Sequence, residues 1–224
     1  MKNVALILAS GKGTRFKADC PKQFLKIGDK CILQYTIEKF ENHPKIDDIY
    51  LVTNPEYVDK VTELSASYSK VVKVVAGGET RKNSSYNGIM AISEDECNVL
   101  IHDGVRPFVT DEIIDSCINE LSHGSAVCTA VDSTDTVYIT DKYDFINTIP
   151  QRRLVKCAQT PQCFKLSLIK KAHELALKDE TCVVTDDCGL ISNYGLSKIK
   201  IINGSEKNIK ITFEDDIELA KKYL

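Results

Sequence analysis

The 224-residue sequence has no apolar run long enough to cross a membrane. A membrane-spanning helix needs about 20 consecutive, mostly apolar residues, and the apolar run that begins at Val4 is far shorter. The N-terminus also lacks the pattern of a secretory signal peptide. We therefore expect a cytoplasmic protein that does not use a membrane as its partner.

An excess of basic residues is absent as well. The 29 Lys and Arg residues are outnumbered by 32 Asp and Glu residues, which gives a formal net charge of −3 at pH 7. Proteins that bind nucleic acid or an anionic membrane surface usually carry a positive excess, so we expect neither as a partner. A site for an anionic ligand in this chain must gather its positive charge locally.

The nine cysteines contain no C-x-x-C pair. Closely spaced pairs are typical of zinc sites, and an odd number of cysteines does not suit a complete set of disulfides. Most of these cysteines lie in apolar segments, where a free thiol behaves as a small hydrophobic group. We expect reduced, partly buried thiols and no cysteine-bound metal.

What the sequence does contain is a regular alternation of apolar strands and amphipathic helices. A strand over 4–8 is followed by helical spacing of apolar residues over 32–40, and the same order recurs further along the chain. Such alternation is typical of a parallel sheet covered on both faces. We predict an α/β fold, Rossmann-like, with a mostly parallel sheet and helices on both faces. The segments that fit its strands are 4–8, 49–53, 71–75, 97–101, 125–131 and 199–202.

The alternation stops between residues 132 and 154. Two short apolar segments, 136–139 and 145–149, flank turn-like residues, which indicates a β-hairpin. An apolar hairpin has no core of its own and must pack against something. Because residues 1–224 show no linker or repeat, we predict a single domain with 132–154 as a protruding β-arm. We expect a second copy of the chain, in a homodimer, to cover this arm.

The first strand leads into a short basic loop, Ser10-Gly11-Lys12-Gly13-Thr14-Arg15, and then into Pro21-Lys22-Gln23. Backbone N–H groups of such glycine-bearing loops bind phosphate oxygens. The loop is not a P-loop, because no glycine stands five positions before Gly11, and it is not a dinucleotide fingerprint, because Phe16 occupies the place of the third glycine. An ordinary strand-to-helix turn would explain the glycines alone. Arg15 and Lys22 favour a site for a nucleoside triphosphate.

Two further polar segments follow predicted strands, at the edge where open α/β sheets bind ligands. The first is the loop 77–88, for which an ordinary turn and helix cap is the alternative explanation. In the second, Asp103 ends a strand and Arg106 follows it. An acidic residue in this place can hold a ribose hydroxyl or Mg²⁺, and the arginine can bind a phosphate. An internal salt bridge between Asp103 and Arg106 remains an alternative.

Six segments stand in an order that resembles one enzyme family. They are Gly11-Lys12-Gly13-Thr14-Arg15 with Pro21-Lys22-Gln23; Gly77-Gly78-x-x-Arg81-x-x-Ser84; His102-Asp103 with Arg106-Pro107; Arg152 with Gln159-Thr160-Pro161-Gln162; Thr185-Asp186-Asp187; and Asn208-Ile209-Lys210-Ile211-Thr212. Together they resemble the cytidylyltransferases of the methylerythritol phosphate pathway and the related ribitol 5-phosphate cytidylyltransferases. The resemblance spans nearly the whole chain. It implies a nucleotidyltransferase that couples CTP to a polyol phosphate, releases pyrophosphate, and uses Mg²⁺ or another divalent cation.

The resemblance also implies roles for individual residues. The implied catalytic cations are Arg15, Lys22 and Lys210, which would neutralise charge on the reacting phosphates. The implied CTP-binding residues are Ala9, Ser10, Gly11, Gly13, Thr14, Gly78, Glu79, Ser84 and Asp103. Within this set, Gly78, Glu79 and Ser84 would recognise the cytosine edge, and Asp103 would lie near the ribose and the metal. The residues implied to hold the polyol phosphate are Arg106, Arg152, Thr160 and Thr185, with Arg152 reaching across the dimer.

The identity of the acceptor rests on three departures from the usual methylerythritol pattern. They are Val105 and Phe108 beside the Arg-Pro pair, the segment 135–138 without a following lysine, and Ile149-Pro150 ahead of Arg152. They favour ribitol 5-phosphate or a related straight-chain polyol phosphate, as used in teichoic acid or capsule synthesis. The alternative acceptor is 2-C-methyl-D-erythritol 4-phosphate of isoprenoid biosynthesis.

Two alternatives from other classes stay open. One is an enzyme that activates a different sugar phosphate with a different nucleotide, against which the cytosine-facing residues argue. The other is a catalytically silent nucleotide-binding subunit, against which the complete set of cations argues.

Overall fold

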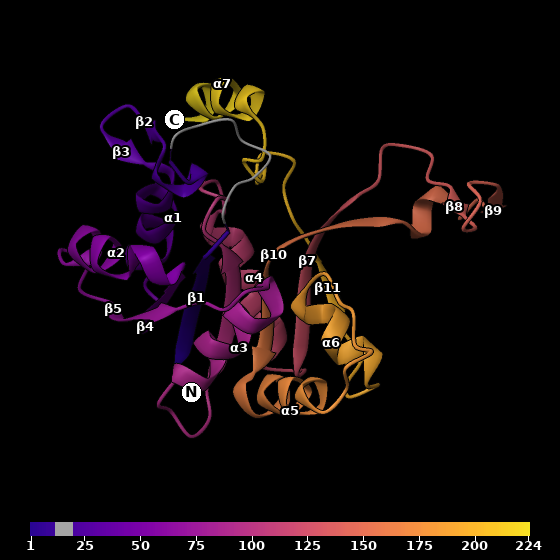
Figure 1. Ribbon diagram of the computed structural model, residues 1–224, viewed down its shortest axis with the longest axis horizontal. Helices are drawn as coiled ribbons and strands as arrows, with labels where there is room; N and C mark the ends of the chain where they lie inside the picture. The colour runs from indigo at the N-terminus through magenta and orange to yellow at the C-terminus, as the bar shows by residue number, and fades with distance from the viewer. Residues whose placement is uncertain (12–19) are drawn as a thin grey trace.

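The computed structural model describes residues 1–11 and 20–224 (Figure 1). Its centre is a seven-stranded sheet with the order β11-β7-β10-β6-β1-β4-β5. β10 runs antiparallel to its neighbours β6 and β7, and the other pairs are parallel. The strands are β1 (Asn3–Ala9), β4 (Asp48–Thr53), β5 (Val71–Ala76), β6 (Asn98–Asp103), β7 (Ala126–Asp132), β10 (Lys156–Lys165) and β11 (Lys200–Asn203). The predicted mostly parallel sheet is confirmed.

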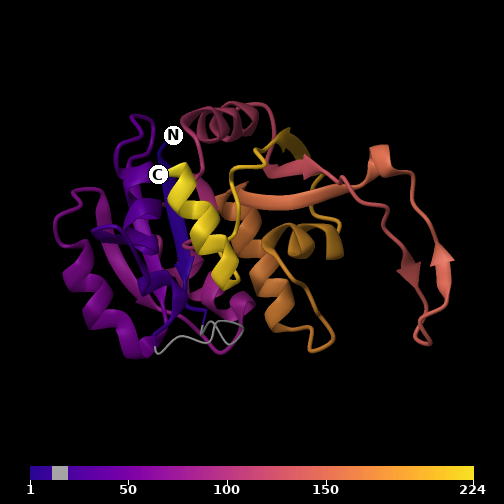
Figure 2. The ribbon, with the colours of Figure 1, turned by 90° about the horizontal axis from the view of Figure 1, so that it is seen from above.

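Helices cover both faces of this sheet (Figures 1 and 2). Alternate residues of the buried strand β1 join two different cores, since side chains of a strand point to opposite faces. Ala5 and Ile7 pack with α1, α2 and α4, whereas Val4 and Leu6 pack with α3, α5 and α6. The helices are α1 (Ile32–Glu41), α2 (Val58–Ser65), α3 (Arg81–Ala91), α4 (Asp111–Leu121), α5 (Leu166–Leu177), α6 (Asp187–Asn193) and α7 (Glu214–Tyr223).

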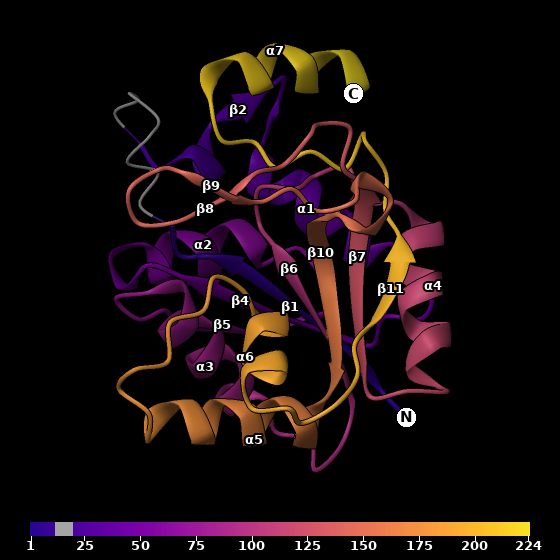
Figure 3. The same ribbon diagram turned by 90° about the vertical axis from the view of Figure 1, so that its right-hand side faces the viewer.

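The C-terminal helix α7 lies beyond the carboxyl ends of the parallel strands, beside β2 (Figure 3). A third, smaller core joins it to the rest of the molecule through Ala220, which packs with Ile27, Ile211 and Phe108. The remaining short elements are η1 (Lys22–Phe24), β2 (Lys26–Ile27), β3 (Lys30–Cys31), η2 (Pro55–Tyr57) and η3 (Arg152–Leu154). The C-terminal segment thereby returns to the edge of the sheet at which the first loop begins.

The strand β10 is the one long element that the apolar pattern does not predict. Its residues Gln159, Thr160 and Gln162 are polar and yet buried. Each has hydrogen-bond partners inside the protein, such as the Ser205 carbonyl for Gln159 and Asp186 for Gln162. A buried strand with polar side chains has no apolar run, and so it escapes detection by hydrophobicity.

The predicted hairpin arm is present. β8 (Ile139–Thr140) and β9 (Ile146–Thr148) form a separate two-stranded sheet that projects from the body of the molecule (Figures 1 and 2). Its apolar side chains lack cover within the described chain: Phe145 is 71% exposed and Tyr143 is 68% exposed. The assignment of 1–224 to a single domain stays a prediction. In the described part of the chain, no helix has the length and apolarity needed to cross a membrane.

The close approach of α3 to the sheet depends on Gly88. A Cβ atom at Gly88 would lie 2.7 Å from both Leu6 Cδ1 and Val52 Cγ2, and both of these side chains are fully buried. We expect Gly88→Val to lower the free energy of unfolding by about 1–3 kcal/mol, because the helix must move off the sheet. Denaturant unfolding measures this change.

The matched control is Gly124→Val. A Cβ at Gly124 would meet nothing closer than the Glu120 carbonyl oxygen at 3.6 Å, so the free energy of unfolding should stay within about 0.5 kcal/mol of the wild-type value. Equal destabilisation by the two variants would contradict the packing role of Gly88.

Candidate active site

A cavity of about 280 Å³ opens at the carboxyl ends of β1 and β6, next to the N-terminus of α3. Ligands of open α/β folds bind at this edge of the sheet. The cavity combines the loop after β1, the loop after β5, the end of β6 and the C-terminal segment that precedes α7. Its lining residues are Leu8, Ala9, Ser10, Gly11, Lys22, Gln23, Asn54, Gly78, Glu79, Thr80, Arg81, Ser84, Asp103, Val105, Lys210 and Thr212.

Most of the residues implied by the resemblance meet in this cavity. The sequence-predicted residues that line it are Ala9, Ser10, Gly11, Lys22, Gly78, Glu79, Ser84, Asp103 and Lys210. Gly13, Thr14 and Arg15 lie outside the described residues. Arg106, Arg152, Thr160 and Thr185 are not among the lining residues. The roles of all these residues stay predictions.

Ser84 holds the two glycine-bearing loops together. Its hydroxyl lies 2.8 Å from the Ser10 hydroxyl and accepts a hydrogen bond from the Gly78 N–H at 3.1 Å. A Cβ at Gly77 would lie 2.8 Å from both the Ser10 Cβ and the Ser84 Oγ, so this close approach requires glycine. On the other side, the Gln23 side-chain amide donates to the Ala9 carbonyl at 2.7 Å. The backbone around Ser10 is therefore fixed from two directions.

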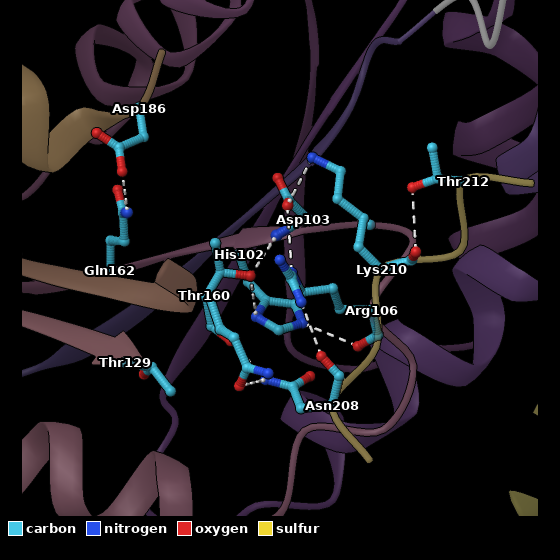
Figure 4. Close-up of polar contacts among 12 residues, drawn as sticks. His102, Asp103, Arg106, Thr129, Thr160, Gln162, Asp186, Asn208, Lys210 and Thr212 are labelled. Carbon is cyan, nitrogen blue, oxygen red and sulfur yellow. Dashed lines mark hydrogen bonds and ion pairs between the residues drawn. The ribbon is translucent and has the colours of Figure 1, made fainter. Parts of the chain in front are cut away.

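Asp103 is the electrostatic centre of the cavity (Figure 4). Its Oδ2 atom lies 3.0 Å from Lys210 Nζ and 3.4 Å from Arg106 Nε, and Arg81 also acts on it through its charge. Burial alone would raise the pKa of the Asp103 carboxyl, but the three cations together hold it well below its usual range. The carboxylate stays ionised, and it keeps the cations close together.

Lys22 is buried, and it is anchored to the C-terminal segment. Its Nζ donates to the Ile211 carbonyl at 2.9 Å. The Ile211 N–H in turn donates to the Val105 carbonyl at 2.9 Å. Lys210, half-exposed, precedes this anchor. Two predicted catalytic lysines, far apart in the sequence, are thus held by one short backbone segment.

Beneath Asp103, His102 and Thr160 form a buried hydrogen-bonded pair (Figure 4). Burial lowers the pKa of His102 to about 4, so its ring is neutral near pH 7. His102 Nε2 lies 3.0 Å from the Arg106 carbonyl oxygen, which only accepts hydrogen bonds, so Nε2 carries the proton. Nδ1 then accepts from the Thr160 hydroxyl at 3.0 Å, and that hydroxyl accepts from the Asp103 N–H at 3.1 Å.

The remaining predicted acceptor residues lie in different environments. Arg106 is buried, and its Nη1 donates to the Asn208 carbonyl at 2.7 Å. Arg152 is exposed at the base of the arm, where its Nη2 donates to Thr136 Oγ1 at 3.0 Å. Thr185 is exposed and lines a separate small cavity next to α6. A single chain therefore does not bring these side chains to one point.

Arg81 is the main functional candidate without a role in the sequence-based interpretation. It lines the cavity and its charge acts on Asp103. The signal was present in the Gly77-Gly78-x-x-Arg81-x-x-Ser84 segment. Its buried partner Asp187, 2.7 Å from Arg81 Nη1, could not be recognised because it lies in a different segment.

The described residues contain no group of three or more His, Cys, Asp and Glu side chains that could hold a metal. Asp103 and Glu79 are the carboxylates among the lining residues of the cavity. Mg²⁺ commonly takes one or two carboxylates from the protein and completes its shell with water and substrate phosphates. The donors present fit that mode of binding rather than an all-protein site.

Known proteins resemble this chain over its full length. The model of the family described as 2-C-methyl-D-erythritol 4-phosphate cytidylyltransferase matches residues 3–224. A protein of that name from Clostridium botulinum (strain Loch Maree / Type A3) is 41% identical, over 100% of this chain and 97% of the relative. One from Lachnospira eligens is 36% identical, over 99% of both chains.

Solved structures agree with these relatives. The 4-diphosphocytidyl-2C-methyl-D-erythritol synthase from Anaerococcus prevotii is 34% identical with a TM-score of 0.89, over 99% of this chain and 97% of the other. The 2-C-methyl-D-erythritol 4-phosphate cytidylyltransferase from Francisella tularensis is 30% identical with a TM-score of 0.84, over 100% of both.

The expectation of ribitol 5-phosphate as the acceptor is wrong, because these relatives carry the methylerythritol name over the whole chain. Of the residues that suggested it, Val105 and Phe108 are buried in the small core with Ile211, and Val105 also lines the cavity. Tyr138 and Ile149 are exposed on the arm. The chain is a nucleotidyltransferase and belongs to the 2-C-methyl-D-erythritol 4-phosphate cytidylyltransferase family.

Proposed function

We propose that this protein transfers the cytidylyl group of CTP to 2-C-methyl-D-erythritol 4-phosphate, with formation of 4-diphosphocytidyl-2C-methyl-D-erythritol and pyrophosphate. The observation that carries the proposal is the concentration of Lys22, Lys210 and Arg81 in one cavity of a chain whose net charge is −3. Such a cavity suits a ligand with several phosphates. The acceptor follows from the names of the relatives.

In the proposed reaction, an oxygen of the acceptor phosphate attacks the α-phosphorus of CTP. A new O–P bond forms, the bond between the α-phosphorus and the bridging oxygen breaks, and pyrophosphate leaves with the electron pair. The acceptor phosphate is already ionised near neutral pH, so no strong general base is needed. Neither His102, which is buried and hydrogen-bonded, nor the ion-paired Asp103 is required to accept a proton.

The protein then acts by positioning and by neutralising charge. We assign the triphosphate to the loop after β1, with Lys22 and Lys210 near the α-phosphate and Arg15 as a third cation. Gly78, Glu79 and Ser84 would bind the cytosine edge, since Ser84 fixes the backbone there. Asp103 would lie near the ribose. The residues assigned to the acceptor are Arg106, Arg152, Thr160 and Thr185.

We assign a divalent cation, Mg²⁺ in the simplest case, to the neighbourhood of Asp103. Asp103 would supply one protein ligand, and the phosphates would supply further oxygens. When bound, the cation would offset charge on the phosphates. Lys210 and Arg106 already contact this carboxylate, so the protein holds it in a fixed orientation.

We also propose a homodimer formed through the β-arm. The arm exposes the large apolar side chains of Tyr143, Phe145 and Leu154, and a two-stranded hairpin is not stable by itself in water. A second copy of the chain would cover them. Arg152, at the base of the arm, would then enter the acceptor site of the partner, which would explain why it is not among the residues that line the cavity of its own chain.

The acceptor is tested by measuring pyrophosphate release with CTP and a panel of polyol phosphates. We expect kcat/KM with 2-C-methyl-D-erythritol 4-phosphate to exceed that with ribitol 5-phosphate by about 100-fold or more, since buried polar groups left unpaired strongly disfavour the wrong substrate. UTP and ATP serve as nucleotide controls. A faster reaction with ribitol 5-phosphate would overturn the proposed acceptor.

The charge of Lys210 is tested with Lys210→Met, which keeps the apolar stem. We expect kcat to fall by about 100-fold or more, as for the loss of other groups that stabilise transition-state charge. Lys207→Met, in the same segment but outside the cavity lining, should retain wild-type kcat. A Lys210→Met enzyme within twofold of wild type would remove Lys210 from the catalytic set.

The arm is tested with the double substitution Phe145→Asp, Ile149→Asp. We expect the mass of the protein in solution to drop from that of a dimer to the 25.0 kDa of one chain, because the two introduced aspartates would bury their charges in the interface. Light scattering measures the mass. Val72→Asp, at an exposed apolar residue of β5, should stay dimeric; a wild-type protein that is already monomeric would refute the proposed dimer.

A further inference from the structure

Arg81 and Asp187 form an ion pair that joins the cavity to α6. Arg81 is the first residue of α3 and lines the cavity, whereas Asp187 is the first residue of α6 and is only 1% exposed. The distance from Arg81 Nη1 to Asp187 Oδ2 is 2.7 Å. The two residues lie far apart in the sequence, so this contact exists only through the fold.

The Asp187 carboxylate is itself held from several elements. Its Oδ1 accepts a hydrogen bond from the Ser85 hydroxyl of α3 at 2.5 Å and lies 3.7 Å from His173 Nε2 of α5. Its backbone N–H donates to Gln162 Oε1 of β10 at 3.1 Å. Burial opposes ionisation of Asp187, but Arg81, His173 and Ser85 hold its pKa below the usual value. The carboxylate is a fixed point to which Arg81 is attached.

The guanidinium of Arg81 has N–H donors other than those on Nη1, the atom that is paired with Asp187. A guanidinium carries five N–H donors in a rigid planar fork, so fixing one side orients the others. Within the described ranges, Asp187 is the residue whose contact with the guanidinium is a close ion pair, and Asp103 acts on it only through charge. The orientation of the remaining donors is therefore set by the position of Asp187.

We propose that Asp187 is a positioning residue for nucleotide binding: it orients Arg81 so that the remaining guanidinium donors bind CTP, while Ser85 and His173 keep Asp187 in place. This inference rests on the proposed use of CTP and adds Arg81 to the residues that contact it. It gives α6 a role in nucleotide affinity although α6 supplies no residue to the cavity lining.

The test is a double-mutant cycle on the dissociation constant of CTP, measured by calorimetry without acceptor. We expect Asp187→Asn and Arg81→Met each to weaken CTP binding about tenfold, the effect of about one hydrogen bond to a charged group. The double variant should bind CTP no more weakly than Arg81→Met, because Asp187 acts only through Arg81. A purely structural role of Asp187 would instead give additive effects.

Asp179→Asn is the matched control, because it also removes a carboxylate charge close to α6. Asp179 accepts hydrogen bonds from the Thr181 N–H and from the Tyr194 hydroxyl, each at 3.0 Å, and it lies outside the cavity lining. Its substitution should leave the dissociation constant of CTP within about twofold.

Ser85→Ala provides a second test if Asp187→Asn folds poorly. It removes one contact of Asp187, and it should weaken CTP binding about threefold, but only when Arg81 is present. Unchanged CTP binding in Asp187→Asn, or equal losses from Ser85→Ala with and without Arg81, would overturn the positioning role. A wild-type protein that binds CTP but does not use 2-C-methyl-D-erythritol 4-phosphate would overturn the proposed acceptor and leave this inference intact.

Discussion

The cavity depends on one buried carboxylate. Asp103 ends β6 and is surrounded by Lys210, Arg106 and Arg81. A buried carboxylate is stable only when cations and hydrogen bonds replace the water that it has lost. The cations also depend on the carboxylate, because without it the three positive charges would repel one another in the cavity. The ion cluster therefore lets an acidic protein maintain a locally positive site, which a triphosphate ligand requires.

This cluster requires the C-terminal segment to pack against residues from the start and the middle of the chain. Lys210 comes from the C-terminal segment, which is not a strand of the sheet. Hydrogen bonds hold this segment: Asn208 donates to the Thr160 carbonyl at 2.9 Å, and the Ile211 carbonyl accepts from Lys22. The Thr160 hydroxyl in turn orients Asp103 by accepting a hydrogen bond from the Asp103 backbone N–H. The site is completed only when β10 and the C-terminal segment are both in place.

The sheet could be predicted where its strands are apolar, and not elsewhere. β1, with every residue buried, is recognisable from its composition because both of its faces pack against helices. β10 is equally central, but its buried Gln159, Thr160 and Gln162 are satisfied by distant partners. A pattern based on hydrophobicity cannot reveal such a strand. The resemblance to known enzymes includes these residues only as part of the Gln159-Thr160-Pro161-Gln162 motif.

Motifs indicated which residues gather at the site but not what holds them. Asp186 and Asp187 stand next to each other in the Thr185-Asp186-Asp187 motif. Asp186 caps α6, whereas Asp187 is buried and paired with Arg81. Likewise, Val105 and Phe108 suggested a particular acceptor, although they pack in a small core. In each case the residue that determines the role, Arg81 for Asp187 and Ile211 for Val105 and Phe108, lies in a distant segment of the sequence.

Arg81 links the cavity to α6, since its single positive charge acts on both Asp103 and Asp187. The carboxylate at the end of β6 and the carboxylate at the start of α6 therefore share one cation. A displacement of α6 would change the pairing of Arg81, and with it the balance of charge around Asp103. The nucleotide cavity and the helix behind it are electrostatically one unit, even though they are built from different segments of the chain.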